Sequence, residues 1–95
     1  MNSINILGKT YTIVYINTIP GETEEVRGMV DDKIGTIYVR TDMSLDEVQE
    51  TILHETIHAI ELALCLDMSE KLVSRLSVGL YQVLTQNGHD WRGKI

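Results

Sequence analysis

The chain has few of the residues that usually stabilise a small protein through disulfides, rigid turns or large aromatic side chains. Its 95 residues include one cysteine, Cys65, one proline and no phenylalanine, and aromatic residues make up 5% of the sequence. A single cysteine excludes an internal disulfide and indicates a reducing compartment, so we expect a cytoplasmic protein with Cys65 as a small buried apolar residue. At this length we expect one domain, residues 1–95, whose core is filled by leucine, isoleucine and valine.

Basic residues are also scarce, and no long apolar run is present. The sequence holds 8 Lys and Arg against 14 Asp and Glu, which gives a net charge of −6. This charge argues against direct nucleic-acid binding, which needs basic surface, and it suits a basic protein partner. The longest apolar-rich stretch, residues 57–66, is interrupted by His58 and Glu61 and is too short to cross a membrane. We therefore expect neither a nucleic-acid partner nor a membrane segment.

The N-terminal half of the chain has the composition of β-strands. Residues 10–16 are rich in β-branched and aromatic side chains, and residues 4–7 precede them across a turn at Gly8. Residues 34–40 alternate in character, which predicts a third strand. Residues 22–30 are polar and acidic without a convincing period, so we expect a loop or a short helix there.

Two helices are predicted in the second half of the chain. Residues 44–47 form a capping box, and apolar positions continue from there at near-helical spacing to Leu64. A second helix is predicted over residues 70–86, and residues 87–88 are its Asn-Gly stop signal. The predicted fold class is therefore α+β: a small three-stranded antiparallel or mixed sheet packed on the first helix, with the second helix after it.

The first helix carries the pattern His54-Glu55-Thr56-Ile57-His58. On a helix, residues four apart share one face, so His54 and His58 direct two imidazoles toward one point, where they can bind Zn²⁺. Glu55 sits one residue round the helix, where it can reach a water on that metal and act as general base. The alternative is a pair of surface histidines at helical spacing, but the apolar residues around the motif favour a mostly buried helix.

A catalytic zinc usually has three protein ligands and one open position. Five side chains after the motif are candidates for the third ligand: Glu61, Asp67, Glu70, His89 and Asp90. We favour Glu70, because a chain reversal at residues 66–69 would return the first turn of the second helix to the metal face. Glu61 lies three residues after His58 on a face already occupied by two ligands, which favours a supporting role. The structural alternative for Glu70 is to cap its own helix.

Residues 51–59, Thr-Ile-Leu-His-Glu-Thr-Ile-His-Ala, resemble the active-site helix of the ImmA/IrrE-type metallopeptidases of phages, mobile elements and bacteria. In that family the third ligand is a glutamate that opens a pattern of Glu, two residues, Ala, Asn or Asp, one residue, Phe and Ala. Here Glu70 matches the glutamate. Four later positions differ from the family pattern: Val73, Ser74, Leu76 and Ser77. The resemblance covers residues 34–86 and implies a minimal, gluzincin-like member with a single zincin-like domain.

The resemblance implies a zinc-dependent metallopeptidase in which His54, His58 and Glu70 hold Zn²⁺ and Glu55 is the catalytic base. It also implies that the strand at residues 34–40 lies at the sheet edge beside the cleft, where a peptide substrate adds as a further strand. The substrate that the family suggests is a protein, such as a DNA-binding helix-turn-helix repressor, cut by limited proteolysis.

Other assignments stay open. The group that stabilises the oxyanion is Tyr38 or His89, because Tyr81 lies roughly 16 Å along the second helix from Glu70. A second hypothesis is a non-cleaving zinc-containing protein-binding module of the same fold, and a third is a metal-free structural domain. The presence of Glu55 favours the peptidase, since a purely structural zinc site needs no general base. The small size of the domain, with little room for a cleft, favours the module.

Overall fold

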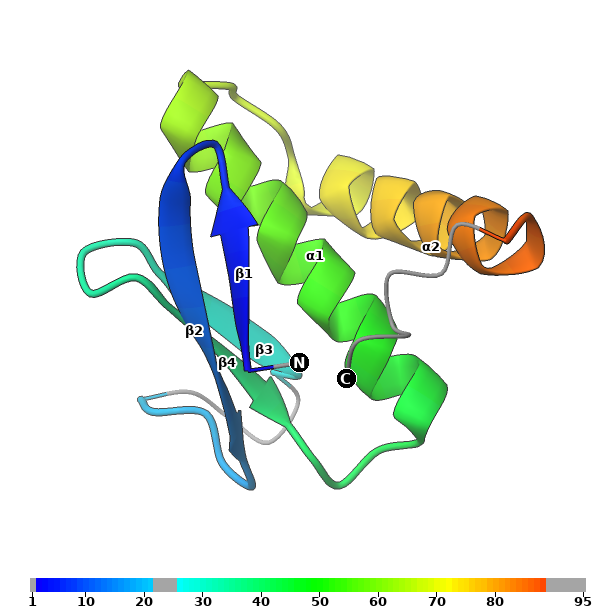
Figure 1. Cartoon of the computed structure of the whole chain (residues 1–95), viewed down its shortest axis with the longest axis horizontal. Coiled ribbons are helices and arrows are strands. Elements are labelled where there is room, and N and C mark those ends of the chain that lie inside the picture. Colours follow the sequence, from blue (N-terminus) through cyan, green and yellow to red (C-terminus); the bar gives the residue numbers. More distant parts are fainter. Residues whose placement is uncertain (1, 22–25, 89–95) are drawn as a thin grey trace.

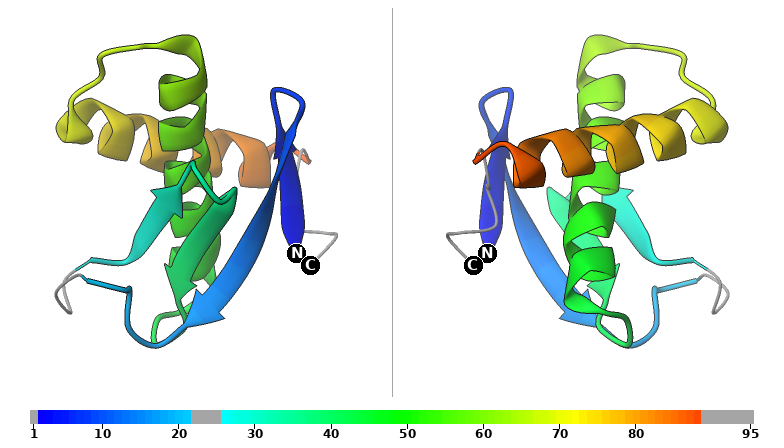
Figure 2. Two further views of the ribbon diagram at one scale, coloured as in Figure 1. Left: turned by 90° about the vertical axis from the view of Figure 1, so that its left-hand side faces the viewer. Right: turned by 90° about the vertical axis from the view of Figure 1, so that its right-hand side faces the viewer.

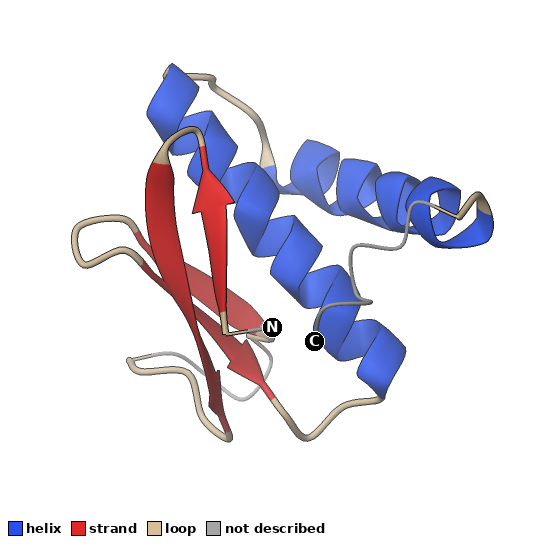
Figure 3. Cartoon of the chain, viewed as in Figure 1, coloured by secondary structure: helices blue, strands red, loops and turns tan. Residues whose placement is uncertain are grey.

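A computed structural model describes residues 2–21 and 26–88 of the chain. Within these residues, four strands are followed by two helices (Figures 1 and 3), so the α+β class is confirmed. The elements are β1 (Ser3–Ile6), β2 (Lys9–Ile16), β3 (Gly28–Asp31), β4 (Thr36–Arg40), α1 (Leu45–Leu64) and α2 (Glu70–Gln86). Neither helix combines the length and the apolar character needed to cross a membrane.

The sheet has four strands in the order β1-β2-β4-β3, so the expectation of three strands is wrong. β2 and β4 run parallel, and the two outer pairs are antiparallel. The additional strand is β3, which falls in the segment where a loop or short helix was expected. All four residues of β3 are half-buried, so no alternation of apolar and polar positions marks it as a strand.

The position of β3 also corrects the expected edge of the sheet. β4 pairs with β2 on one side and with β3 on the other, so the strand within residues 34–40 is internal and not an edge strand. The edge beside the helices is β3. At the opposite edge, β1 and β2 are joined by a tight turn at Leu7 (φ 50°) and Gly8 (φ 87°), which confirms the turn predicted there.

Helix α1 begins and ends at local signals in the sequence. The Ser44 hydroxyl accepts a hydrogen bond from the Glu47 backbone N–H at 3.2 Å, as predicted. The helix ends at Cys65, which adopts a left-handed conformation with φ 54°. Cys65 is exposed, so the expectation that it is buried is wrong. Cys65 is the C-cap of α1, where the chain turns into the loop that leads to α2 (Figure 1).

The core lies between the sheet and one face of α1. Its central members are isoleucines, valines and one tyrosine: Ile6, Tyr11, Ile13, Ile37, Val39, Val48 and Ile52. Ala59 completes this cluster where α1 passes over the sheet. None of the leucines is buried, although leucine was expected in the core. β-Branched side chains fill the core because it is built on a pleated sheet, whose surface they suit.

Helix α2 forms a third layer on the side of α1 that faces away from the sheet (Figures 1 and 2). It crosses α1 steeply and packs mainly against it. Only Val73 and Ser77 of α2 are buried. The Ser69 hydroxyl caps the helix by accepting a hydrogen bond from Leu72 N–H at 3.1 Å. Because Ser69 performs this capping, the carboxylate of Glu70 is not used for it and is available for other contacts.

Candidate metal centre

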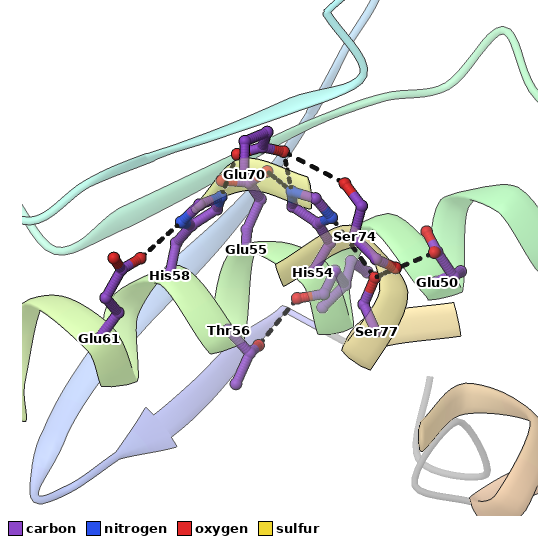
Figure 4. Close-up of polar contacts among 10 residues, drawn as sticks. Glu50, His54, Glu55, Thr56, His58, Glu61, Glu70, Ser74 and Ser77 are labelled. Atoms are coloured by element: carbon purple, nitrogen blue, oxygen red, sulfur yellow. Dashed lines mark hydrogen bonds and ion pairs between the residues drawn. The ribbon is translucent and has the colours of Figure 1, made fainter. Parts of the chain in front are cut away.

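The two histidines of α1 point at the same carboxylate (Figure 4). The Nε2 atom of His54 lies 2.7 Å from Glu70 Oε1, and the Nε2 atom of His58 lies 2.8 Å from Glu70 Oε2. The two imidazole rings are 4.9 Å apart between centroids. The chain reversal between the helices therefore places Glu70 over both rings, twelve residues after His58. The structure brings together the three residues predicted as ligands, and their metal-binding role stays a prediction.

The side of the His58 ring that faces away from Glu70 is held by Glu61, which is itself held by the loop after α1. His58 Nδ1 lies 3.0 Å from Glu61 Oε1, and the other oxygen of Glu61 accepts the Met68 backbone N–H at 2.9 Å. With a proton on Nδ1, the ring donates to Glu61 and leaves the Nε2 lone pair for a metal. The sequence had favoured such a supporting role for Glu61, as a partner of a ligand and not as a ligand itself.

The far side of the His54 ring is held from α2. His54 Nδ1 lies 3.4 Å from the Ser77 hydroxyl, which is fully buried between the helices. The same hydroxyl lies 3.1 Å from Glu50 Oε1 and 3.0 Å from the carbonyl oxygen of Ser74 (Figure 4). Ser77 can accept from the His54 N–H while it donates to one of these oxygens. In the sequence, Ser77 is marked only by its departure from the family pattern, which gives no sign of this role.

Glu55 is buried next to the two histidines. Its side chain is 8% exposed, and its Oε2 atom lies 3.9 Å from His54 Nε2. Burial raises the pKa of Glu55 to about 7, an effect that Glu70 increases and that His58 and the Val30 N–H oppose. A carboxyl group with a pKa near neutrality has the proton affinity that suits a general base.

Glycine at position 28 allows β3 to approach this carboxylate. A Cβ atom at Gly28 would lie 2.7 Å from the Thr51 Cγ2 atom and 3.1 Å from the Glu55 Cγ atom. Contacts this short require a residue without a side chain. Gly28 was not identified from the sequence, because the strand that contains it was expected to be a loop or helix. The burial of Glu55 depends on this close approach.

The charges at the centre act on each other. Burial lowers the pKa of His58, but the carboxylates of Glu61, Glu55 and Glu70 outweigh that effect and raise it above the ordinary histidine value. The hydrogen bond from Met68 N–H, together with His58, lowers the pKa of Glu61. The His58 ring is therefore surrounded by negatively charged carboxylates, which favour a positive charge at this position.

A cavity of about 630 Å³ opens beside the centre, between β3, α1 and α2. The histidine that faces it is His54, and Glu55 and Glu70 line it as well. Gly28 contributes the wall on the strand side, and Val78 contributes the wall on α2. This volume lies within the range of small-ligand sites in proteins. The small domain therefore does have room for a ligand next to the side chains predicted to bind the metal.

Several predicted candidates lie elsewhere. Tyr38 alternates with two β4 residues that face α1, so its side chain is on the opposite face of the sheet. The Tyr81 hydroxyl donates to Asp46 at 2.7 Å, near the N-terminus of α1. Asp67 is exposed in the loop between the helices. Two further candidates are outside the described residues, His89 and Asp90.

The donor set fits zinc, which binds imidazole nitrogen and carboxylate oxygen in open three-ligand sites. Ligand atoms of His54, Glu55 and His58 also lie within 4.8 Å of one another, which makes Glu55 the alternative third ligand. Glu70 is the better choice, because its two oxygens lie 2.7 and 2.8 Å from the histidine nitrogens.

Comparisons of the chain with protein-family models, with curated proteins and with solved structures find no match.

Proposed function

We propose that the chain is a zinc-dependent metallopeptidase similar to the ImmA/IrrE type, in which His54, His58 and Glu70 hold the metal. The observation that carries this proposal is the convergence of both histidine Nε2 atoms on the Glu70 carboxylate. A buried glutamate, Glu55, lies beside that point. Two imidazoles and a carboxylate, with a second carboxylate next to them, are the ligands and the base that metal-assisted hydrolysis needs.

Zinc at this position would polarise the scissile carbonyl and lower the pKa of a water molecule. Glu55 then accepts the proton of the attacking water and passes it to the leaving amine. Its burial against β3 favours the uncharged carboxylic acid that carries the proton between these two steps. Glu61 and Ser77 hold the histidine rings from behind, so that both Nε2 atoms keep their direction.

The free edge of β3 is where we propose that the peptide binds. Arg40 N–H donates to Arg27 C=O at 2.9 Å, so the alternation of an antiparallel ladder turns the backbone groups of Gly28 and Val30 away from β4. The Val30 N–H lowers the pKa of Glu55, so the carboxylate of Glu55 lies close to this edge. A peptide added to β3 would therefore lie beside the proposed base.

A protein substrate is part of the proposal. The net charge of −6 favours a partner with basic surface, and a DNA-binding repressor has such a surface. We propose that the enzyme acts in the cytoplasm on such a repressor, without direct contact with nucleic acid or a membrane. The non-cleaving zinc-containing binding module is the outcome that the second experiment below would reveal.

The metal site is tested by elemental analysis of purified protein. Wild type should contain close to one zinc per chain, His58→Ala should lose it, and Glu70→Ala should retain little. The control is Asp67→Ala, which removes a carboxylate of the connecting loop and should keep full zinc content. Full zinc content in Glu70→Ala would contradict its ligand role and transfer that role to Glu55.

Catalysis is tested with Glu55→Gln, which keeps the size of the side chain but cannot accept the proton of water. This variant should keep its zinc and its fold and should produce no fragments. The substrate screen co-expresses each form with helix-turn-helix repressors of the same genome and looks for defined fragments. Fragments formed equally by both forms would refute the mechanism. Stable binding of a repressor by both forms, without fragments, would instead support the non-cleaving module.

A further inference from the structure

Helix α2 carries a row of apolar residues that the rest of the described chain covers only in part. We call it the α2 seam, and it consists of Leu72, Leu76, Gly79, Leu80 and Val83. The four side chains of the seam are 40–50% exposed. Four of the positions, residues 72, 76, 79 and 83, have the alternating spacing of four and three that places side chains against a second helix. The seam is thus arranged for helix packing, yet it faces solvent in the single chain.

Gly79 is an independent sign of a missing neighbour. A Cβ atom at this position would meet nothing within 4 Å, so no contact among the residues that the structure describes requires a glycine here. Glycine in the interior of an exposed helix is less favourable than alanine because it loses more backbone entropy on folding. Its absent side chain would, however, allow another helix to come close at the middle of the seam.

We propose that two copies of this chain pair through the α2 seam with their α2 helices antiparallel. Placing Leu80 of each copy over Gly79 of the other centres the pair between these two positions. The same register brings Leu76 of each copy against Val83 of the other. In this arrangement Leu80 of each helix packs into the space above Gly79 of the other, so the seam is complementary to itself. Self-complementarity is the requirement of a two-fold symmetric interface, and it identifies a second copy as the occupant.

The charges of α2 fit the antiparallel arrangement. The charged residues of α2 are confined to its first six positions: Glu70, Lys71 and Arg75. Residues 76–86 are uncharged, so an antiparallel pair sets the charged end of each helix beside the uncharged end of the other. A parallel pair would instead place Lys71 and Arg75 of one copy beside the same residues of the other, where like charges repel. The sequence of the helix therefore selects one orientation.

The pairing leaves the metal centre accessible. Glu70, Ser74 and Ser77 lie on the side of α2 that faces α1, and the seam lies on a different side of the helix. The proposal therefore does not depend on the proposed peptidase activity. A contact made by one helix of 17 residues is smaller than a standard interface of about 800 Å² per partner, so we expect a weak dimer with a dissociation constant on the order of micromolar.

The first test is sedimentation equilibrium of the 95-residue chain from low micromolar to near-millimolar concentration. The mass should rise with concentration from that of one chain toward that of two. Leu76→Lys, a substitution at a side chain that is 40% exposed, should keep the fold and remain monomeric. The matched control is Leu45→Lys on α1, at a leucine that is 70% exposed and outside the seam, and it should dimerise like wild type. A wild-type chain that stays monomeric throughout the range would overturn the proposal.

The second test uses Gly79→Ala, which should stabilise the fold of the monomer but weaken the dimer. The melting temperature of the dilute monomer should rise, since alanine favours the helix and has open space there. The dissociation constant of the dimer should rise at least about tenfold, because the added methyl group fills the notch for Leu80. Dimerisation as tight as that of wild type would rule out close packing at Gly79 and with it the proposed pairing.

Discussion

The two faces of α1 are built on different principles. On the sheet side, Ile52 and Ala59 are fully buried against residues such as Ile37 and Val39, and the contact is mainly apolar. The polar side chains of Gln49 and Thr51 of α1 are buried as well. On the α2 side, only Val73 among the apolar residues of α2 is buried, and polar contacts, chief among them the histidine–carboxylate network, make up much of the rest. The comparison indicates that apolar burial on the sheet side holds the fold, whereas the position of α2 depends on polar contacts and on the metal that they are proposed to bind.

The largest expected effect is on the sheet side. Ile52→Ala should lower the free energy of unfolding by about 2–5 kcal/mol, because it leaves a cavity at a fully buried position. Val73→Ala on the α2 side removes fewer atoms and should cost less. Denaturant unfolding of both metal-free variants measures the difference. An equal or larger loss in Val73→Ala would show that the α2 side contributes as much to stability as the sheet side does.

Removal of the proposed metal should act mainly on the α2 side. A ligand that binds only the folded state stabilises it by roughly 3–4 kcal/mol at a concentration on the order of 100 to 1,000 times its dissociation constant. A chelator should therefore lower the melting temperature, and hydrogen exchange should quicken more in α2 than in β2 and β4. An unchanged melting curve after verified metal removal would contradict this dependence. Equal loss of protection in α2 and the central strands would contradict its localisation.

Gly28→Ala tests the close approach of β3 to α1. The added methyl group would collide with Thr51 and Glu55 and with the carbonyl of Tyr38, which gives an expected cost of about 1–3 kcal/mol. The effect is measured as the shift of the denaturant midpoint. The control is Gly79→Ala, which has open space in the single chain and should be neutral or stabilising when measured in dilute solution. A neutral Gly28→Ala would show that the strand can move away without cost.

The supports of the two histidines should differ in strength. Glu61→Gln and Ser77→Ala should each weaken zinc binding, within the range of about 10–100-fold that is usual for such partners. Glu61 should have the larger effect, because its contact with His58 is 3.0 Å, against 3.4 Å between Ser77 and His54. Zinc titration against a competing chelator measures both affinities. Thr85→Ala is the control and should keep the affinity, because the Thr85 hydroxyl donates to the Tyr81 carbonyl of its own helix. An unchanged affinity in Glu61→Gln would contradict its supporting role.

The smallest effect concerns pH and the hydrogen bond between Tyr11 of β2 and Asp32, which follows β3. A hydrogen bond to Asp32, with burial, raises the pKa of Tyr11 to about 12 in the folded protein, against about 10 when unfolded. The uncharged tyrosine is favoured in the folded state, so its contribution is full below about pH 10 and is lost as pH rises through about 12.

This pH dependence is measured as the free energy of unfolding at about pH 8 and about pH 11. Wild type should lose more stability between the two than Tyr11→Phe or Asp32→Asn does. Equal losses in all three proteins would show that the Tyr11–Asp32 hydrogen bond does not contribute to this dependence.

Local signals in the sequence predicted local structure well. The Ser44 cap and the turn at Gly8 depend on residues next to one another in the chain, and both are found where they were predicted. The errors concern structure that depends on distant partners. β3 was missed and the edge of the sheet was misplaced, because the pairing of β3 with β4 leaves no periodic pattern in four half-buried residues. Cys65 and the leucines were placed in a core that isoleucine and valine fill.

The sequence by itself determined that His54 and His58 share one helix face, since four residues make about one turn, and that acidic residues surround them. Only the tertiary structure decided what meets those rings. Glu70 comes over them through the reversal between two helices, and Ser77 reaches His54 from 23 residues away. Glu55 is buried because Gly28 lets an unforeseen strand approach. Helical periodicity is a property of neighbouring residues, whereas these contacts depend on how separate elements pack, which sequence spacing alone does not contain.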